Sequence, residues 1–241
     1  MTTGKPDPFD AAASFQTIAR DPEQLRSFLA CIGDANAPSR RRAVDLLALC
    51  ESVVDVGCGP AVLADSFAVV GRGLGDAGGI QYVGVDTSPE LLQLAADRLA
   101  LSVDATCTPA QTVRRVLEDG ESGLVLCNAI EALGSAPLRP LADAVVIRHV
   151  LEHMRDPSEL LRFAAAATRK RLVVVLSQDT RTHGMAGPLM TDRHLGAMRW
   201  SHWRPAMLRV VESCGLRLFH HQAGSAGGLV AREELFCWAR P

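Results

Sequence analysis

The chain has 241 residues, with 25 lysines and arginines against 27 aspartates and glutamates, and seven cysteines that include no Cys-x-x-Cys pair. Balanced charge without a basic block argues against binding to nucleic acid, and widely spaced cysteines argue against a disulfide framework or a thiolate zinc site. The chain opens with no signal pattern and contains no apolar run of bilayer length, so we expect a cytoplasmic protein that makes no use of a membrane.

Two helical patterns come first in chain order, at about residues 22–31 and 39–49, and Ser39 is the expected N-cap of the second. From residue 52 the pattern changes to short β-branched runs that are separated by helical stretches. These runs predict strands at residues 52–56, 81–85, 123–127, 144–150 and 172–176.

The tail of the chain has a different pattern. A helix is predicted at residues 205–213, and two strand-like runs follow at residues 216–221 and 234–239. A glycine-rich segment at residues 223–228 joins these two runs, which is typical of an antiparallel hairpin.

Strands that alternate with helices indicate βαβ units, which place parallel strands in one sheet with right-handed crossovers. We therefore predict an α/β fold of the Rossmann-like, doubly wound type. It has a mostly parallel seven-stranded sheet, helices on both faces and a C-terminal antiparallel hairpin. Residues 1–50 are expected to form a helical cap segment of the same domain, and residues 51–241 its main part.

The strongest local signal is a strand that enters a glycine turn before a helix, over residues 53–69. Gly57 and Gly59 let the backbone turn sharply and approach a ligand, and the helix start offers free N–H groups. The plainer alternative is a tight connection that binds nothing. A second strand ends in Asp86, whose carboxylate could accept both ribose hydroxyl protons of an adenosine. The stretch from Gly59 to Asp86 exceeds the roughly twenty residues expected, and the glycine-rich segment 71–79 accounts for the excess.

Two common nucleotide motifs are missing from this turn. A nicotinamide-binding G-x-G-x-x-G turn requires glycine at the position of Val62. A P-loop requires a Gly-Lys-Ser/Thr sequence after the turn, and none follows. The turn therefore suits an adenosine but lacks the residues that bind a pyrophosphate.

Three segments in order, residues 55–61, 83–89 and 143–153, resemble the successive motifs of class I S-adenosylmethionine-dependent methyltransferases. The likeness is greatest to the small-molecule branch that includes quinone-biosynthesis enzymes, and it covers about residues 50–180. The resemblance implies that residues 51–241 form a methyltransferase domain and that its cofactor is S-adenosyl-L-methionine.

The resemblance also implies where the cofactor binds. Gly57 and Gly59 would lie beneath its methionine part, with Asp55 near the amino group, and Asp86 would hold the ribose. Ala61 stands where the family usually has a third glycine.

The adenine end of the predicted site departs from the family. Asn128 and Ala129 follow the third strand, where the family usually has an aspartate that meets the adenine amino group. The amide oxygen of Asn128 can still accept that hydrogen bond. Thr87 and Arg148, within the matching motifs, complete the predicted cofactor-binding set.

Residues 149–153 also spell H-x-x-E-H, a pattern found in one group of zinc proteases. The resemblance places this segment where the fourth strand runs into a helix, so His149 and His153 need not share a helical face. We therefore predict no metal site, and we expect Glu152 and His153 to orient the turn or to cap the helix.

A group of imidazole and indole side chains lies between residues 177 and 204, where the family builds part of its substrate pocket. Its members are His183, His194, Trp200, His202 and Trp203. Such side chains could grip an organic substrate and take a proton from it. The alternatives are histidines with surface or structural roles and tryptophans that pack the last helix onto the sheet.

His149 is the first candidate for the proton acceptor, because it follows the fourth strand at the carboxyl edge of the sheet, where this architecture binds ligands. His202 is the second, since it lies between two tryptophans in the expected lid. An acceptor that is already nucleophilic would need no base, and positioning would then be the whole catalytic contribution.

The sequence thus predicts transfer of a methyl group to a small organic acceptor, such as a secondary metabolite, by in-line displacement. The acceptor atom, whether O, N or C, stays open. One alternative is a non-catalytic binding or regulatory protein that keeps the fold. Another is a different adenosine-cofactor enzyme, such as a dehydrogenase. Balanced charge favours a small-molecule partner over nucleic acid.

Overall fold

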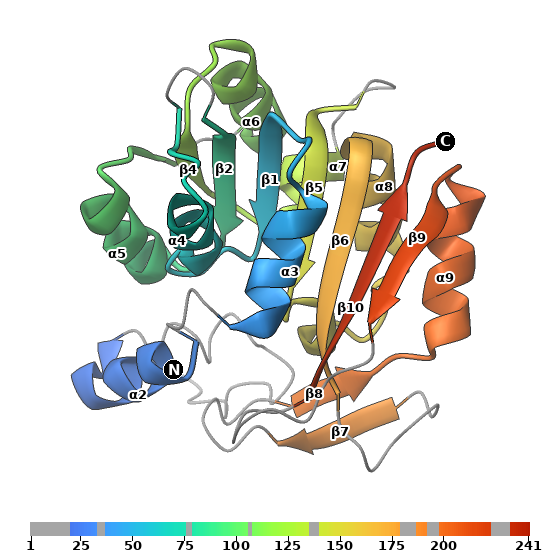
Figure 1. The fold of residues 1–241 in the computed structure, drawn as a ribbon. Coiled ribbons are helices and arrows are strands. Elements are labelled where there is room, and N and C mark those ends of the chain that lie inside the picture. Colours follow the sequence, from blue (N-terminus) through green and yellow to red (C-terminus); the bar gives the residue numbers. More distant parts are fainter. Residues whose placement is uncertain are drawn as a thin grey trace.

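The computed structural model describes residues 20–32, 37–75, 79–105, 108–134, 140–178, 187–191, 198–222 and 232–241. A twisted sheet stands in the middle, with helices on both faces (Figure 1). The helices are α2 (Pro22–Ile32), α3 (Pro38–Leu46), α4 (Val62–Val69), α5 (Pro89–Leu99), α6 (Pro109–Glu118), α7 (Ala129–Gly134), α8 (Ser158–Ala167), α9 (Arg204–Ser213) and the short 3-10 helix η1 (Leu151–His153). The strands are β1 (Ser52–Val56), β2 (Gln81–Asp86), β3 (Val103–Asp104), β4 (Gly123–Leu126), β5 (Ala142–Arg148), β6 (Thr168–Gln178), β7 (Gly187–Thr191), β8 (Met198–Ser201), β9 (Arg217–Gln222) and β10 (Arg232–Ala239).

The main sheet has the strand order β3-β4-β2-β1-β5-β6-β10-β9. Its strands from β3 to β6 pair in parallel, and β10 runs antiparallel to both of its neighbours, β6 and β9. The predicted Rossmann-like α/β class and the terminal hairpin are confirmed. The sheet has eight strands rather than seven because β3, only two residues long, pairs with the edge of β4.

Parallel strands in this sheet are buried on both sides, which explains their unbroken aliphatic runs. Every residue of β1 is buried. One hydrophobic cluster packs the sheet against α6, α7, α8 and α9, and a second packs the other face against α3, α4 and α5. Helices therefore cover both faces, and binding is left to the ends of the strands.

Two of the predicted boundaries differ for reasons that the structure shows, one local and one a contact with a distant residue. Ala37, not Ser39, is the N-cap of α3, because Pro38 takes the first helical position, where its missing N–H does no harm. Strand β6 begins at Thr168, before the apolar run. Its polar start is held by Asp143, whose carboxylate lies 2.8 Å from Arg169 Nη1 and 2.7 Å from Lys170 Nζ.

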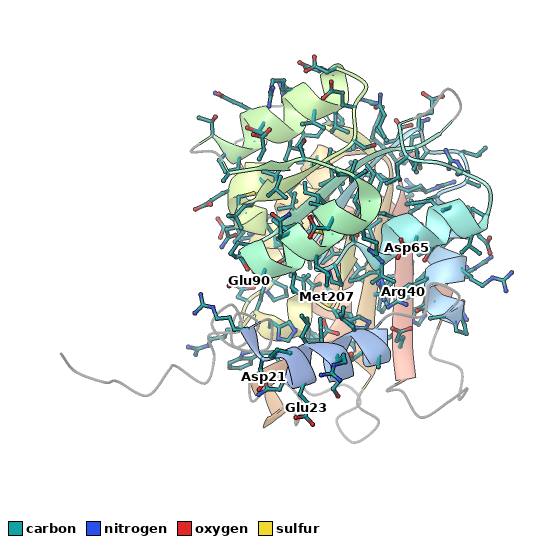
Figure 2. The ribbon with its side chains drawn as sticks, turned by 90° about the vertical axis from the view of Figure 1, so that its left-hand side faces the viewer. Asp21, Glu23, Arg40, Asp65, Glu90 and Met207 are labelled. Atoms are coloured by element: carbon teal, nitrogen blue, oxygen red, sulfur yellow. The ribbon has the colours of Figure 1, made fainter. Side chains whose placement is uncertain are left out.

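The carboxyl ends of the parallel strands meet at the lower edge of the sheet in Figure 1, where α2 and the β7–β8 pair also lie. Figure 2 shows α2 below the labelled Glu90. Arg20, beside the start of α2, bonds through Nε to Glu90 Oε1 at 3.1 Å. Elements from both ends of the chain therefore border this edge. The division of the domain at residue 50 stays a prediction.

No helix in the described part of the chain is both long and apolar enough to span a bilayer.

Candidate active site

The turn between β1 and α4 holds three residues in the left-handed conformation, with φ of 66° at Gly57, 52° at Gly59 and 55° at Ala61. The N–H of Gly57 donates to the carbonyl of Val85 at 2.8 Å and ties the turn to β2. Glycine adopts this conformation freely, whereas alanine does so at a cost of about 1–2 kcal/mol. Ala61 is fully buried at the N-cap of α4, so it keeps a glycine-like backbone without being glycine.

The two glycines of the turn have different surroundings. A Cβ atom on Gly57 would lie 2.2 Å from Cγ2 of Val150, the residue two positions beyond β5. A Cβ atom on Gly59 would meet only Leu91 Cδ1, at 3.9 Å. Gly57 is therefore required by close packing as well as by its φ, while a Cβ atom on Gly59 would make only an ordinary van der Waals contact, so that Gly59 is required by its φ.

Asp86 lies at the end of β2, directly against the glycine turn. Its Oδ2 accepts the N–H of Gly59 at 2.8 Å, and its Oδ1 accepts the N–H of Ser88 at 2.9 Å. Burial raises the pKa of the carboxyl group, although these backbone hydrogen bonds oppose the shift. The Asp86 carboxylate therefore lies at the carboxyl end of the strand next to β1, against the glycine turn. Thr87 follows on the exposed side, and ribose binding by Asp86 stays a prediction.

The Asp55 carboxylate is buried within the sheet. Its side chain accepts a hydrogen bond from the hydroxyl of Tyr82, on β2, at 2.7 Å. Burial raises the pKa of Asp55 to about 6, against the opposing effects of the Tyr82 hydrogen bond and of the positive charge of Arg148. The predicted contact of Asp55 with the cofactor amino group is untested, and Tyr82 is the partner that the sequence did not indicate.

Asn128 stands at the start of α7 and is exposed. Its amide oxygen accepts the N–H of Ile130 at 2.8 Å, and its carbonyl accepts the N–H of Ala132 at 3.0 Å, so Asn128 caps this helix. An amide oxygen has two lone pairs, and the predicted adenine contact would use the second. Ala129 is the first residue of α7, beside this cap.

The end of β5 brings together a charged group that sequence reasoning found only in part. Nδ1 of His149 lies 3.2 Å from Oε1 of Glu152, and Nε2 lies 2.8 Å from Oε1 of Glu233. Arg148 Nη2 is 3.9 Å from the same Glu233 oxygen. Glu233 comes from β10 and was not predicted, since no local pattern marks a contact between strands so distant in the chain.

The carboxylates of Glu152 and Glu233 determine the protonation of His149. Burial alone would lower the pKa of His149, but the hydrogen bonds to Glu152 and Glu233 outweigh it and raise that pKa. Burial alone would raise the pKa of both glutamates, yet the hydrogen bond with His149 brings each to about 2. His149 therefore favours its protonated form.

His202 has the opposite environment. It is buried beyond the end of β8, and its Nε2 donates to the carbonyl of Leu151 at 2.6 Å. Burial lowers its pKa, so the neutral ring is favoured, with the lone pair on Nδ1. The guanidinium of Arg204 donates to the carbonyl of His202 at 2.9 Å and to the carboxylate of Glu234 at 2.8 Å.

Both tryptophans of this segment lie near arginine side chains. Trp203 is 45% exposed at the N-cap of α9, and the guanidinium of Arg209 lies 4.7 Å from its ring centre. The guanidinium carbon of Arg155 lies 6.0 Å from the ring centre of Trp200. The other two candidates of this segment, His183 and His194, lie outside the described residues.

The H-x-x-E-H segment is a strand-to-helix junction. His149 has a left-handed φ of 54° and lies before η1, whereas His153 is the last residue of η1. The two histidines are therefore not one turn apart on a regular helix, as a zinc-protease signature requires. Among the described residues, no cluster of three or more His, Cys, Asp or Glu side chains is arranged to hold a metal.

Comparison with known proteins identifies the family of the chain. The methyltransferase-domain family matches residues 17–224, which is most of the chain. No curated protein matches the chain. The protein thus belongs to the methyltransferase-domain family, and the predicted class I S-adenosylmethionine-dependent methyltransferase is confirmed.

Several solved structures share the fold at low sequence identity. Magnesium protoporphyrin IX methyltransferase from Synechocystis PCC 6803 with bound SAM has a TM-score of 0.62 at 14% identity, over 100% of both chains. N-methyltransferase NodS from Bradyrhizobium japonicum WM9 has a TM-score of 0.58 at 14% identity, over 96% of this chain and 99% of that one. The 1,6-didemethyltoxoflavin-N1-methyltransferase of Burkholderia thailandensis has a TM-score of 0.57 at 13% identity, over 100% of this chain and 93% of that one.

Proposed function

We propose that this protein transfers the methyl group of S-adenosyl-L-methionine to a small organic acceptor by in-line displacement. The observation that carries the proposal is the left-handed glycine turn after β1, whose Gly59 N–H donates to the Asp86 carboxylate at the end of β2. This edge is where a sheet of this type binds an adenosine.

The residues present fit the cofactor. Gly57 and Gly59 offer a turn without side chains, and Asp86 and Asn128 offer oxygen acceptors at the ends of adjacent strands. The guanidinium of Arg148, at the end of β5, has a buried Nε with no hydrogen-bond partner among the described residues. It is therefore available to a cofactor carboxylate. When bound, S-adenosyl-L-methionine supplies a methyl group that its sulfonium has already activated.

The chain itself must then align the acceptor and exclude water. Helix α2 and the β7–β8 pair border the carboxyl edge and are suited to cover a bound molecule (Figure 1). A small acceptor is supported by the balanced charge of the chain. It is also supported by the names of two neighbours in fold, which act on magnesium protoporphyrin IX and 1,6-didemethyltoxoflavin. A cytoplasmic location, without a nucleic-acid or membrane partner, completes the proposal.

Thermal unfolding with added ligand tests the cofactor assignment. S-adenosylhomocysteine at a hundred times its dissociation constant is expected to stabilise the fold by about 2.7 kcal/mol, and NAD is expected to have no effect. Protection by NAD alone would instead favour the dehydrogenase. S-adenosylhomocysteine binding without turnover across a broad acceptor panel would favour the non-catalytic alternative.

Of the two histidines, we infer that His202 is the better proton acceptor, since its ring is neutral while His149 is held between two carboxylates. In single-turnover methyl transfer, His202→Ala is expected to slow the reaction about a hundredfold or more, with cofactor affinity unchanged. His149→Ala is expected to act mainly through cofactor affinity. Wild-type rates and pH profiles in both variants would mean that neither residue is the base.

A further inference from the structure

His149 is held by carboxylates from two other elements. Its Nδ1 faces Glu152 of η1 at 3.2 Å, and its Nε2 faces Glu233 of β10 at 2.8 Å. A carboxylate oxygen only accepts, so the ring serves both partners only when each nitrogen carries a hydrogen. This is the geometry of an imidazolium between two carboxylates, and we call these three residues the His149 clamp.

Other groups also face the ring or its two carboxylate partners. On β6, Ser177 places its Oγ 3.1 Å from His149 Nδ1 and donates its N–H to Glu152 Oε1 at 2.5 Å. The remaining oxygen of Glu152 is buried and has no hydrogen-bond partner among the described residues. His149 is the main positive group that compensates the charge of Glu152, with a smaller effect of His153. The positive charge of Arg148, on β5, disfavours protonation of the His149 ring. The same charge partly neutralises the negative charge of Glu233.

The clamp holds a strained piece of backbone. His149 has φ of 54°, a conformation that costs a residue with a side chain about 1–2 kcal/mol, and such strain persists only where the surroundings over-determine it. The next residue, Val150, is pressed against Gly57 so closely that a methyl group on Gly57 would lie 2.2 Å from it. The left-handed turn at His149 is thus joined directly to the glycine turn.

We propose that His149 is a positioning residue: the clamp holds the turn that keeps Val150 against Gly57, and it thereby sets the shape of the cofactor-binding turn. This inference rests on the proposed function, because it assigns the glycine turn to the cofactor. The raised pKa of His149 gives the sign of the pH dependence. The clamp is complete at low pH and is lost as the pH rises through the folded-state pKa, above the ordinary value of about 6.5.

The first test follows the wild-type protein between pH 5.5 and 9. NMR would follow the ring signal of His149, assigned by comparison with His149→Asn, and the proton contact between the Val150 methyls and Gly57. Calorimetry would follow the affinity for S-adenosylhomocysteine. We expect all three to change with one midpoint above pH 6.5, and the affinity to fall about fivefold or more across it.

The second test compares two neighbouring glutamates on β10. Glu233→Gln removes one charge from the clamp and is expected to move the midpoint about one pH unit lower. Glu234→Gln is the matched control, since Glu234 bonds instead to Arg204 and His221, at 2.8 Å and 2.9 Å. It is expected to leave the midpoint of the wild type in place.

Three outcomes would overturn the clamp: a ring that titrates below pH 6.5, a Val150–Gly57 contact that does not change with the titration, or equal midpoints in Glu233→Gln and Glu234→Gln. If either variant fails to fold, the wild-type titration alone decides. If S-adenosylhomocysteine binds at no pH, the proposed function fails. The two ligand-free NMR signals would still decide whether the clamp exists.

Discussion

Replacing Gly57 with alanine is expected to lower the stability of the fold by about 2–5 kcal/mol and to abolish measurable S-adenosylhomocysteine binding. A left-handed alanine costs about 1–2 kcal/mol, and forcing a methyl group into a packed site costs about 1–3 kcal/mol more. Here the methyl group would meet Val150 Cγ2 at 2.2 Å. Thermal unfolding and titration calorimetry would measure the two losses.

Gly59→Ala is the matched control for this prediction. Gly59 is also left-handed, with φ of 52°, but its Cβ would approach nothing nearer than 3.9 Å. The free energy of unfolding of this variant should fall only by the cost of a left-handed alanine backbone. The added methyl group would still enter the space assigned to the cofactor. Adding Val150→Ala to Gly57→Ala should recover part of the stability. Equal melting temperatures for Gly57→Ala and Gly59→Ala would contradict the packing argument.

Asp86→Ala is expected to weaken S-adenosylhomocysteine binding at least tenfold. The substitution removes the proposed charge-assisted hydrogen bonds to the ribose, and it also frees the N–H groups of Gly59 and Ser88 that shape the turn. Titration calorimetry would measure the change. Asp97→Ala is a suitable control, because Asp97 bonds to Gln93 on the surface of α5.

An unchanged dissociation constant in folded Asp86→Ala would exclude this carboxylate from the site. Asp86→Asn separates the two roles, since its amide oxygen can still accept from the backbone while its charge is lost. If charge matters most, the asparagine variant should bind nearly as weakly as the alanine variant.

The fold could be predicted because its signals are local. The strands of a buried parallel sheet are short aliphatic runs, and β1, β2 and β4 lie within two residues of the predicted ranges. The errors in the strands fall where a distant partner decides. The polar start of β6 is a strand because Asp143 neutralises Arg169 and Lys170. Strand β3 exists only through its pairing with β4.

The residues of the site also divide into those that the sequence marks and those that only the fold brings together. The glycine turn and Asp86 are visible in the sequence because each follows a strand directly. Glu233, by contrast, reaches His149 only because β10 pairs with β6, and β6 in turn lies next to β5. The protonation of His149 depends on that contact, so the sequence identified the residue but could not determine its charge. The same holds for Asp55, whose burial beside Tyr82 is a tertiary effect.

The position of β10 makes contacts of β9 and of His149 depend on the last strand of the main sheet. In chain order β10 comes after every other strand of the main sheet, yet it lies between β6 and β9 rather than at an edge. During translation, β9 therefore emerges before the neighbour that connects it to the sheet. The glycine turn is synthesised early, but Glu233 emerges from the ribosome only with β10. A chain that lacks β10 therefore leaves β9 without its neighbour in the main sheet and His149 without the Glu233 carboxylate.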